Sequence, residues 1–190
     1  AHTNRDFINC VKLARQVGFD SINMDLIAGL PEDTVAGFER SLRGCIELGA
    51  ENITVHTLTM KRASNLVIKN EEHSYDDVAQ MIEKNKILAD YGYVPYYMYR
   101  QKSTVKNLEN VGFSQLGHES LYNIYIMEEV QTIISCGAGG VSKVVGKQGE
   151  IKRVYNYKYP NEYLKDFNAI IRRKDEVFKL CEEFGLCDKN

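Results

Sequence analysis

Apolar residues recur at helical spacing in three stretches of the first hundred residues, and a glycine follows each stretch. Each helical stretch is followed by a short stretch that alternates between apolar and polar residues or is mainly apolar, as is typical of strands. The helical stretches are residues 7–17, 38–46 and 78–89, and the strand-like stretches are residues 19–27, 52–58 and 94–99. Helices and strands in this order imply a parallel sheet with right-handed crossovers, which is an α/β fold.

The alternation weakens in the second half of the chain. Residues 131–136 are expected to form a strand, and residues 146–149 (GKQG) have the composition of a tight turn between two strands of a hairpin. A helical pattern returns near the C-terminus. We therefore expect residues 1–105 to form βα units and residues 106–190 to form a small α+β extension with a hairpin and helices.

The first expected strand carries polar side chains where a buried strand is normally apolar. Side chains alternate between the two faces of a strand, so Asn23 and Asp25 share one face while Met24 and Leu26 share the other. A carboxylate and an amide on an inner face are costly unless they find partners. Two interpretations stay open: a network that only braces the sheet, or a barrel-like inner face that holds a ligand.

The next two strands repeat this polarity. Thr54 and His56 are expected to lie on the same side as Asp25. His56 is either a hydrogen-bonded core histidine or a catalytic group. In the third strand, Tyr97 and Tyr99 have large apolar rings with polar tips, so they either pack in the core or line a pocket for a flat aromatic ligand.

The composition is that of a soluble globular protein. The chain has 190 residues, of which 44% are hydrophobic and 26% charged. These values exclude a disordered, collagenous or disulfide-stapled chain, and no apolar stretch approaches the roughly 18 residues of a membrane span. The formal net charge of −2 also disfavours a protein whose main partner is a nucleic acid.

The five cysteines are widely spaced, without a C-x-x-C or C-x-x-x-C pair, so the sequence predicts no compact zinc or iron–sulfur site within these residues. Cys10, Cys45 and Cys181 fall on apolar helix stripes and are expected to be core residues in a reducing compartment. Nothing resembles a signal peptide, and we expect a cytoplasmic protein. The cysteines are Cys10, Cys45, Cys136, Cys181 and Cys187.

Residues 137–142 (GAGGVS) form a glycine run that could bring the backbone close to a ligand. The run lacks the third glycine of the dinucleotide-binding fingerprint and the Lys-Ser/Thr pair of a phosphate-binding loop. Two interpretations stay open here as well: a turn into the hairpin, or a close backbone approach to a ligand.

Residues 23–34 read NMDLIAGLPEDT. This block resembles the N-[IM]-D-L-I-x-G-L-P-x-x-T signature of the radical S-adenosylmethionine family that includes oxygen-independent coproporphyrinogen III oxidase. Three further stretches resemble that family in the same order: residues 52–58, residues 91–100 with a G-Y-x-x-Y pattern, and residues 109–142. The resemblance covers most of residues 1–160.

The resemblance implies the C-terminal part of a partial (β/α)6 barrel of the TIM type. In the family, a [4Fe-4S] cluster cleaves S-adenosylmethionine to a 5′-deoxyadenosyl radical, which abstracts hydrogen from the propionate side chains of coproporphyrinogen III. Decarboxylation then forms the vinyl groups of protoporphyrinogen IX. The implied partners are a tetrapyrrole substrate and an electron donor, and no nucleic acid.

The resemblance also implies roles for single residues. Asp25 matches an aspartate at the S-adenosylmethionine site, and Asn23 matches that site less closely. Thr59 matches a position that contacts the cofactor through its backbone. Val144 matches an apolar contact to the nucleoside. His56, Tyr97 and Tyr99 are the candidates for the substrate pocket.

The chain departs from the family in one respect: the C-x-x-x-C-x-x-C motif that binds the cluster is absent from these residues. We therefore expect a C-terminal fragment that is inactive alone, although the parent protein is an enzyme. A half-barrel exposes strand edges, which predicts a homo-oligomer. Two alternatives remain: a haem chaperone of the same family, with His56 or His118 as iron ligand, and a non-radical barrel enzyme that uses Asp25 and His56 as acid and base.

Overall fold

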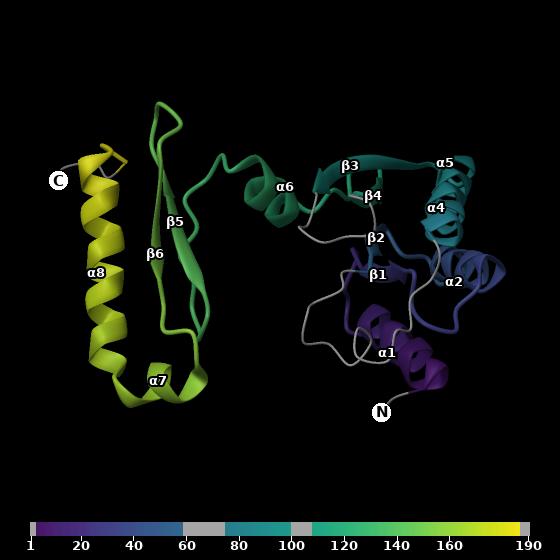
Figure 1. Cartoon of the computed structure of the whole chain (residues 1–190), viewed down its shortest axis with the longest axis horizontal. Helices are drawn as coiled ribbons and strands as arrows, with labels where there is room; N and C mark the ends of the chain where they lie inside the picture. The colour runs from purple at the N-terminus through teal and green to yellow at the C-terminus, as the bar shows by residue number, and fades with distance from the viewer. Residues whose placement is uncertain (1–2, 59–74, 100–107, 187–190) are drawn as a thin grey trace. The chain divides into compact units, whose positions relative to one another are not determined.

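The computed structural model describes residues 3–58, 75–99 and 108–186. Its contacts divide the chain into two compact units, Ala1–Leu121 and Tyr122–Asn190, which are described separately (Figure 1). The predicted boundary at residue 105 lies in a stretch outside the described residues. Within the described residues, no helix has the length and apolarity needed to cross a membrane.

The first unit contains a four-stranded mixed sheet with the order β1-β2-β4-β3. β1 (Asn23–Ala28) and β2 (Asn52–Thr57) are parallel. β4 (Asn110–Gln115) runs antiparallel to both of its neighbours, β2 and β3 (Tyr93–Tyr99). The three expected strands are present and run in one direction. The expectation of a wholly parallel sheet is wrong, because the antiparallel strand β4 lies between β2 and β3.

β4 was missed because its sequence, NVGFSQ, contains asparagine and glycine, which are poor strand formers. Its strand conformation depends on its neighbours: four of its residues pair with β2, and six residues of β3 pair with it on the other side. Tertiary packing therefore overrides the local preference of this segment.

Helices precede and follow the parallel strands. α1 (Asn4–Gln16) begins with a capping box between Thr3 and Asp6. α2 (Val35–Glu47) is capped by Thr34, whose hydroxyl accepts a hydrogen bond from the Gly37 N–H at 2.9 Å. The expected third helix is divided into α4 (Tyr75–Glu83), a 3₁₀ turn η1 (Lys84–Lys86) and α5 (Ile87–Asp90).

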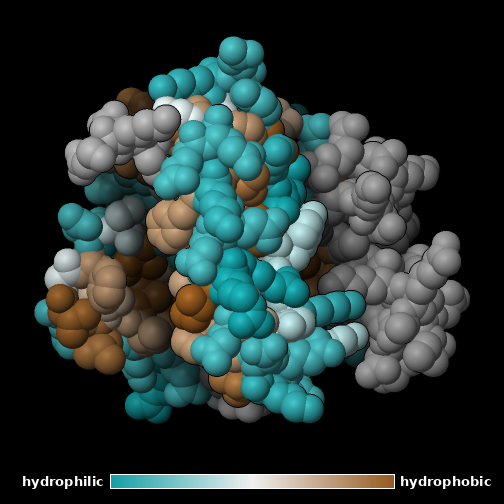
Figure 2. Space-filling model, turned by 90° about the vertical axis from the view of Figure 1, so that its left-hand side faces the viewer, coloured by the Kyte–Doolittle hydropathy of each residue, from teal (hydrophilic) through white to brown (hydrophobic). Residues whose placement is uncertain are grey.

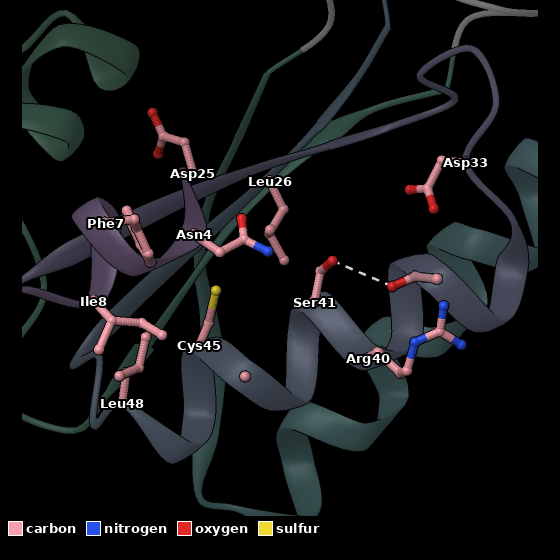
Figure 3. A pocket seen from close by; sticks show the side chains of 12 residues that line it. Asn4, Phe7, Ile8, Asp25, Leu26, Asp33, Arg40, Ser41, Cys45 and Leu48 are labelled. Carbon is pink, nitrogen blue, oxygen red and sulfur yellow. Dashed lines mark hydrogen bonds between the residues drawn. The ribbon is translucent and has the colours of Figure 1, made fainter. Parts of the chain in front are cut away.

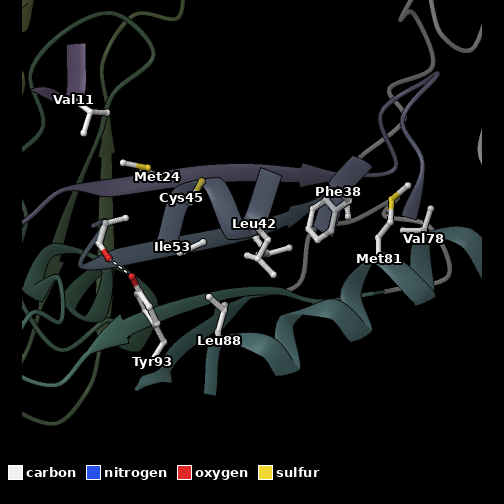
Figure 4. Close-up of a cluster of buried hydrophobic side chains, with 13 residues drawn as sticks. Val11, Met24, Phe38, Leu42, Cys45, Ile53, Val78, Met81, Leu88 and Tyr93 are labelled. Atoms are coloured by element: carbon white, nitrogen blue, oxygen red, sulfur yellow. Dashed lines mark hydrogen bonds between the residues drawn. The ribbon is translucent and has the colours of Figure 1, made fainter. Parts of the chain in front are cut away.

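The core of the first unit lies between the sheet and these helices (Figure 4). Phe38 and Leu42 of α2 pack with Ile53 and Val55 of β2, and each is at most 1% exposed. Burying one such side chain contributes about 1.5–3 kcal/mol relative to leaving it exposed. Since this core occupies one face of the sheet, the polar side chains of β1 and β2 are on the other face.

The second unit is a hairpin covered by a long helix. β5 (Val141–Val145) pairs with β6 (Ile151–Tyr155), and α8 (Phe167–Glu183) packs on them through a small core. These elements confirm the expected hairpin and final helix. α6 (Leu121–Glu128) and α7 (Pro160–Lys165) complete the unit. The strand expected at residues 131–136 is reduced to one bridge, Ile133 to Lys143.

The outer surface of α8 faces the viewer in Figure 2 and is mainly hydrophilic, with separate hydrophobic side chains. Phe167, Ile171 and Phe178 of this helix are among the exposed large apolar residues. The three positions are four and seven residues apart, so these side chains share one side of the helix.

Candidate functional site

The face of the first sheet opposite the core carries the predicted polar residues. Asp25 on β1 is in register with Thr54 on β2, which is in register with Gly112 on β4, and Tyr97 on β3 pairs with Gly112. The structure therefore brings Asn23, Asp25, Thr54, His56, Tyr97 and Tyr99 together on one surface, which we call the polar face.

Asp25 lies at the centre of the contacts on the polar face. Its Oδ1 accepts a hydrogen bond from Asn23 Nδ2 at 2.7 Å, and its Oδ2 is 3.7 Å from His56 Nε2. The His56 ring, followed by Asn23, holds the pKa of Asp25 below its usual value despite partial burial. The Asp25 side chain is 59% exposed, so a carboxylate anion is available to a ligand at neutral pH.

His56 is fixed from its other edge. Its Nδ1 is 2.9 Å from the hydroxyl oxygen of Tyr99, and the two rings meet edge to face. When the Tyr99 hydroxyl donates to Nδ1, the remaining ring proton is on Nε2 and points toward Asp25. The separation of 3.7 Å is longer than a direct hydrogen bond, so Nε2 is left able to interact with a ligand atom.

Tyr97 makes a second connection across the sheet. Its hydroxyl oxygen is 3.3 Å from Thr54 Oγ1, and Thr54 in turn donates to Asn23 Oδ1 at 3.0 Å. The Tyr97 and Tyr99 rings are nearly parallel, with an interplanar angle of 2°. Burial raises the pKa of both phenols above the usual value, so both are protonated at neutral pH.

A cavity of about 540 Å³ lies on the other side of β1, between α1 and α2 (Figure 3). Asp25, Leu26 and Cys45 are among the residues that line it. In Figure 3 the Asp25 carboxylate lies on the opposite side of the β1 ribbon from Leu26. The sequence did not predict that residues of α1 and α2 line this cavity. The helical stripe of apolar residues that begins at Phe7 is the signal in the sequence that could have indicated it.

The structure gives no position relative to the polar face for two further predicted cofactor residues, Thr59 and Val144. Thr59 is outside the described residues. Val144 belongs to the second unit, where it is fully buried with Val154 and Val177 beneath α8. His118, one of the two candidate iron ligands, accepts a hydrogen bond through its backbone carbonyl from Asn52 Nδ2 at 2.7 Å.

The backbone N–H groups of the glycine run are used within the protein. Gly137 donates to the Tyr163 hydroxyl at 3.2 Å, Gly139 donates to the Tyr157 carbonyl at 2.7 Å, and Gly140 donates to the Gly137 carbonyl at 3.4 Å. These bonds hold a turn that leads into β5. They favour the structural interpretation of this run over a close approach to a ligand.

The described residues contain no group of three or more His, Cys, Asp or Glu side chains that could hold a metal ion. Cys45 and Cys181 are buried, as expected, whereas Cys136 is exposed. The expectation that Cys10 is a core residue is wrong, because its position on α1 is exposed. Burial raises the pKa of Cys45 to about 11, so this thiol stays protonated and is a poor metal ligand. The cysteines of the described residues therefore do not fit an iron–sulfur cluster.

No family model matches the chain. The chain is 44% identical over 189 residues to the oxygen-independent coproporphyrinogen-III oxidase-like protein HemZ of Bacillus subtilis, covering 96% of the chain and 37% of that protein. It is 25% identical to the heme chaperone HemW of Buchnera aphidicola, covering 94% of the chain and 45% of that protein. The chain thus spans less than half the length of these relatives.

The fold has a counterpart among solved structures. Coproporphyrinogen III oxidase HemN from Escherichia coli, a radical SAM enzyme, matches with a TM-score of 0.61 over 89% of this chain and 39% of that one. The sequence identity is 17%, so this comparison shows the fold alone. Together with the closely similar HemZ sequence, it agrees with the resemblance of residues 23–34. Nearly the whole chain is thus similar in sequence to a part of an oxygen-independent coproporphyrinogen-III oxidase-like protein, and its fold is similar to a part of a coproporphyrinogen III oxidase.

Proposed function

We propose that the whole protein catalyses oxidative decarboxylation of propionate side chains on a tetrapyrrole of the coproporphyrinogen III type, in haem and porphyrin biosynthesis. The main support is the 44% identity to HemZ along nearly the whole chain. S-adenosylmethionine, together with a reduced [4Fe-4S] cluster, supplies the hydrogen-abstracting species in this chemistry. The described residues hold no fitting cluster site, and we propose that the chain alone is inactive.

The observation that carries the role of this chain is the state of Asp25. Its carboxylate is ionised, mostly exposed and approached at both oxygens by polar neighbours, within the stretch that resembles the family signature. Such a carboxylate accepts hydrogen bonds from a bound S-adenosylmethionine and attracts its positive charge. Asn23 braces the carboxylate through Oδ1.

The remaining residues of the polar face suit the substrate. Tyr97 and Tyr99 present two parallel rings, on which a flat tetrapyrrole can pack. His56 lies between Tyr99, which contacts its Nδ1 at 2.9 Å, and Asp25, which is 3.7 Å from its Nε2. We propose that these three side chains line the substrate pocket next to the cofactor.

The test uses the full-length protein with its cluster reconstituted. Asp25→Asn keeps the shape of the side chain and removes its charge. Since a hydrogen bond to a charged group contributes about 1.5–3 kcal/mol, we expect calorimetry to show at least about tenfold weaker binding of S-adenosylmethionine. Glu47→Gln, at an exposed position of α2 in the same unit, is the matched control. Unchanged affinity in Asp25→Asn contradicts the assigned role.

A second candidate function is haem binding, as in the heme chaperone relatives. The specific observation is that Tyr99 holds His56 at Nδ1, because iron-ligating histidines are commonly oriented by a partner on the other ring nitrogen. Titration of the full-length protein with haem separates the two functions. If the protein is a haem chaperone with His56 as the ligand, the wild type binds haem and converts no coproporphyrinogen. His56→Ala then abolishes the absorbance change on haem addition. The third possibility, a non-radical enzyme that uses Asp25 and His56 as acid and base, is disfavoured by the similarity to HemZ.

A further inference from the structure

Two separate chains of polar contacts cross the sheet and end on the two oxygens of Asp25. In the first, Tyr97 contacts Thr54 at 3.3 Å, Thr54 donates to Asn23 at 3.0 Å, and Asn23 donates to Asp25 Oδ1 at 2.7 Å. This series of contacts therefore starts on β3 and ends on β1. Every hydroxyl and amide along it has a defined partner.

The second chain is shorter and runs beside the first. Tyr99 contacts His56 Nδ1 at 2.9 Å, and His56 Nε2 faces Asp25 Oδ2 at 3.7 Å. Among the described strands, the titratable side chains that face Asp25 are thus His56, Tyr97 and Tyr99. Both tyrosines lie on the far edge strand of the sheet, so both must reach across β4 to make their contacts.

Gly112 makes this reach possible. It pairs with both Thr54 and Tyr97, and a Cβ atom at this position would collide with the Tyr97 ring. The ring therefore lies over the backbone of β4, in the space that any other residue would fill. A residue with a side chain at position 112 would displace Tyr97 from Thr54.

We propose that Tyr97 and Tyr99 are positioning residues that fix the orientation of the Asp25 carboxylate through these two chains. The first series holds Oδ1 through a hydrogen bond, and the second places the His56 ring beside Oδ2, so together they limit the orientations of the carboxylate before a ligand arrives. Such preorganisation lowers the cost of ordering the site on binding. This inference concerns the orientation of Asp25 and does not depend on which ligand Asp25 accepts.

The experiment measures the titration midpoint of the Asp25 carboxyl carbon by NMR in the 190-residue chain, without cofactor. Tyr99→Phe and Tyr97→Phe remove one hydroxyl each and keep the ring that packs over β4. We expect both variants to titrate at higher pH than the wild type, because the neighbours that stabilise the ionised carboxylate become less ordered. Tyr155→Phe, at an exposed position of β6, is the matched control and leaves the midpoint unchanged.

A double-mutant cycle distinguishes the effect of two independent series of contacts from the effect of a general loosening of the sheet. Thr54→Val breaks the first chain at its middle. Combining it with Tyr97→Phe should shift the Asp25 midpoint no further than either substitution alone, since both act on the same series of contacts. Combining it with Tyr99→Phe should give the sum of the two single shifts. The proposal is overturned if the Asp25 midpoint is unchanged in both tyrosine variants, or if all pairs add equally. Because Thr54→Val leaves both tyrosines intact, it tests the first chain even if a tyrosine variant fails to fold.

Discussion

The Glu51 carboxylate and the Arg15 guanidinium form an ion pair at 2.6 Å that ties the end of α1 to the loop before β2. Glu51 also accepts a hydrogen bond from the Ile22 N–H at 2.9 Å, just before β1. The Glu51 side chain is only 15% exposed. This residue therefore joins three segments that are adjacent in space and separate in the sequence.

The first prediction concerns this pair and pH. Although burial acts in the opposite direction, Arg15 and the Ile22 N–H hold the pKa of Glu51 below its usual value. A carboxyl with a depressed pKa contributes stability above its unfolded pKa, about 4.3, and this contribution is lost as pH falls through the folded pKa. Glu51→Gln should lower the free energy of unfolding by about 1.5–3 kcal/mol at pH 7, measured by urea denaturation.

At a pH below the folded pKa of Glu51, the difference between wild type and Glu51→Gln should shrink, since both side chains are then neutral. Glu47→Gln serves as the control, because Glu47 is exposed. An equal loss of stability at acid and neutral pH would refute the role of charge in this contact.

The second prediction uses two glycines. At Gly112 an alanine Cβ would collide with the Tyr97 ring, whereas at Gly44, on α2, nothing lies within 4 Å. Gly112→Ala should therefore lower the free energy of unfolding by about 1–3 kcal/mol, as overpacking does. Gly44→Ala should raise it by about 0.4–1 kcal/mol, because alanine restricts the unfolded chain. Similar effects of the two substitutions on urea denaturation would contradict the placement of Tyr97.

The third prediction concerns thiol chemistry. Cys10 and Cys136 are exposed, whereas Cys45 is 5% exposed and its pKa is raised to about 11. Because the thiolate is the reactive form, Cys10 and Cys136 should react with a thiol reagent at pH 8 much faster than Cys45. Mass spectrometry of partly labelled protein identifies the modified positions. Fast labelling of Cys45 in the folded chain would contradict its burial on the core-facing side of α2.

The fourth prediction addresses association. Within the described residues, β1 pairs only with β2, so its other edge presents unpaired backbone groups. We propose that two copies of the chain associate through this edge, as exposed strands do. Light scattering should give the mass of a dimer, and Ile27→Lys, at a 40% exposed position of β1, should give a monomer. A monomeric wild type at high concentration rules out this proposal.

Several features follow from local sequence alone. Helical spacing of apolar residues predicted α1, α2 and α8, and the turn at residues 146–149 predicted the β5–β6 hairpin. The cap of α2 is equally local, because the Thr34 hydroxyl accepts its hydrogen bond from Gly37, only three residues further along the sequence. Residues 23–34 were enough to indicate the resemblance that the HemZ sequence supports. Each of these signals is contained in a short segment, so it can be read without knowledge of the tertiary structure.

Long-range pairing was decided only by the tertiary structure. The alternation in β1 and β2 predicted which side chains share a face, but it could not show that Tyr97 and Tyr99 meet Thr54 and His56, each pair being 43 residues apart in the sequence. These contacts depend on β4, whose own sequence is unfavourable for a strand. Strand order and register arise from packing between distant segments, and for this reason the polar residues of the site were predicted singly while their connections to Asp25 were not.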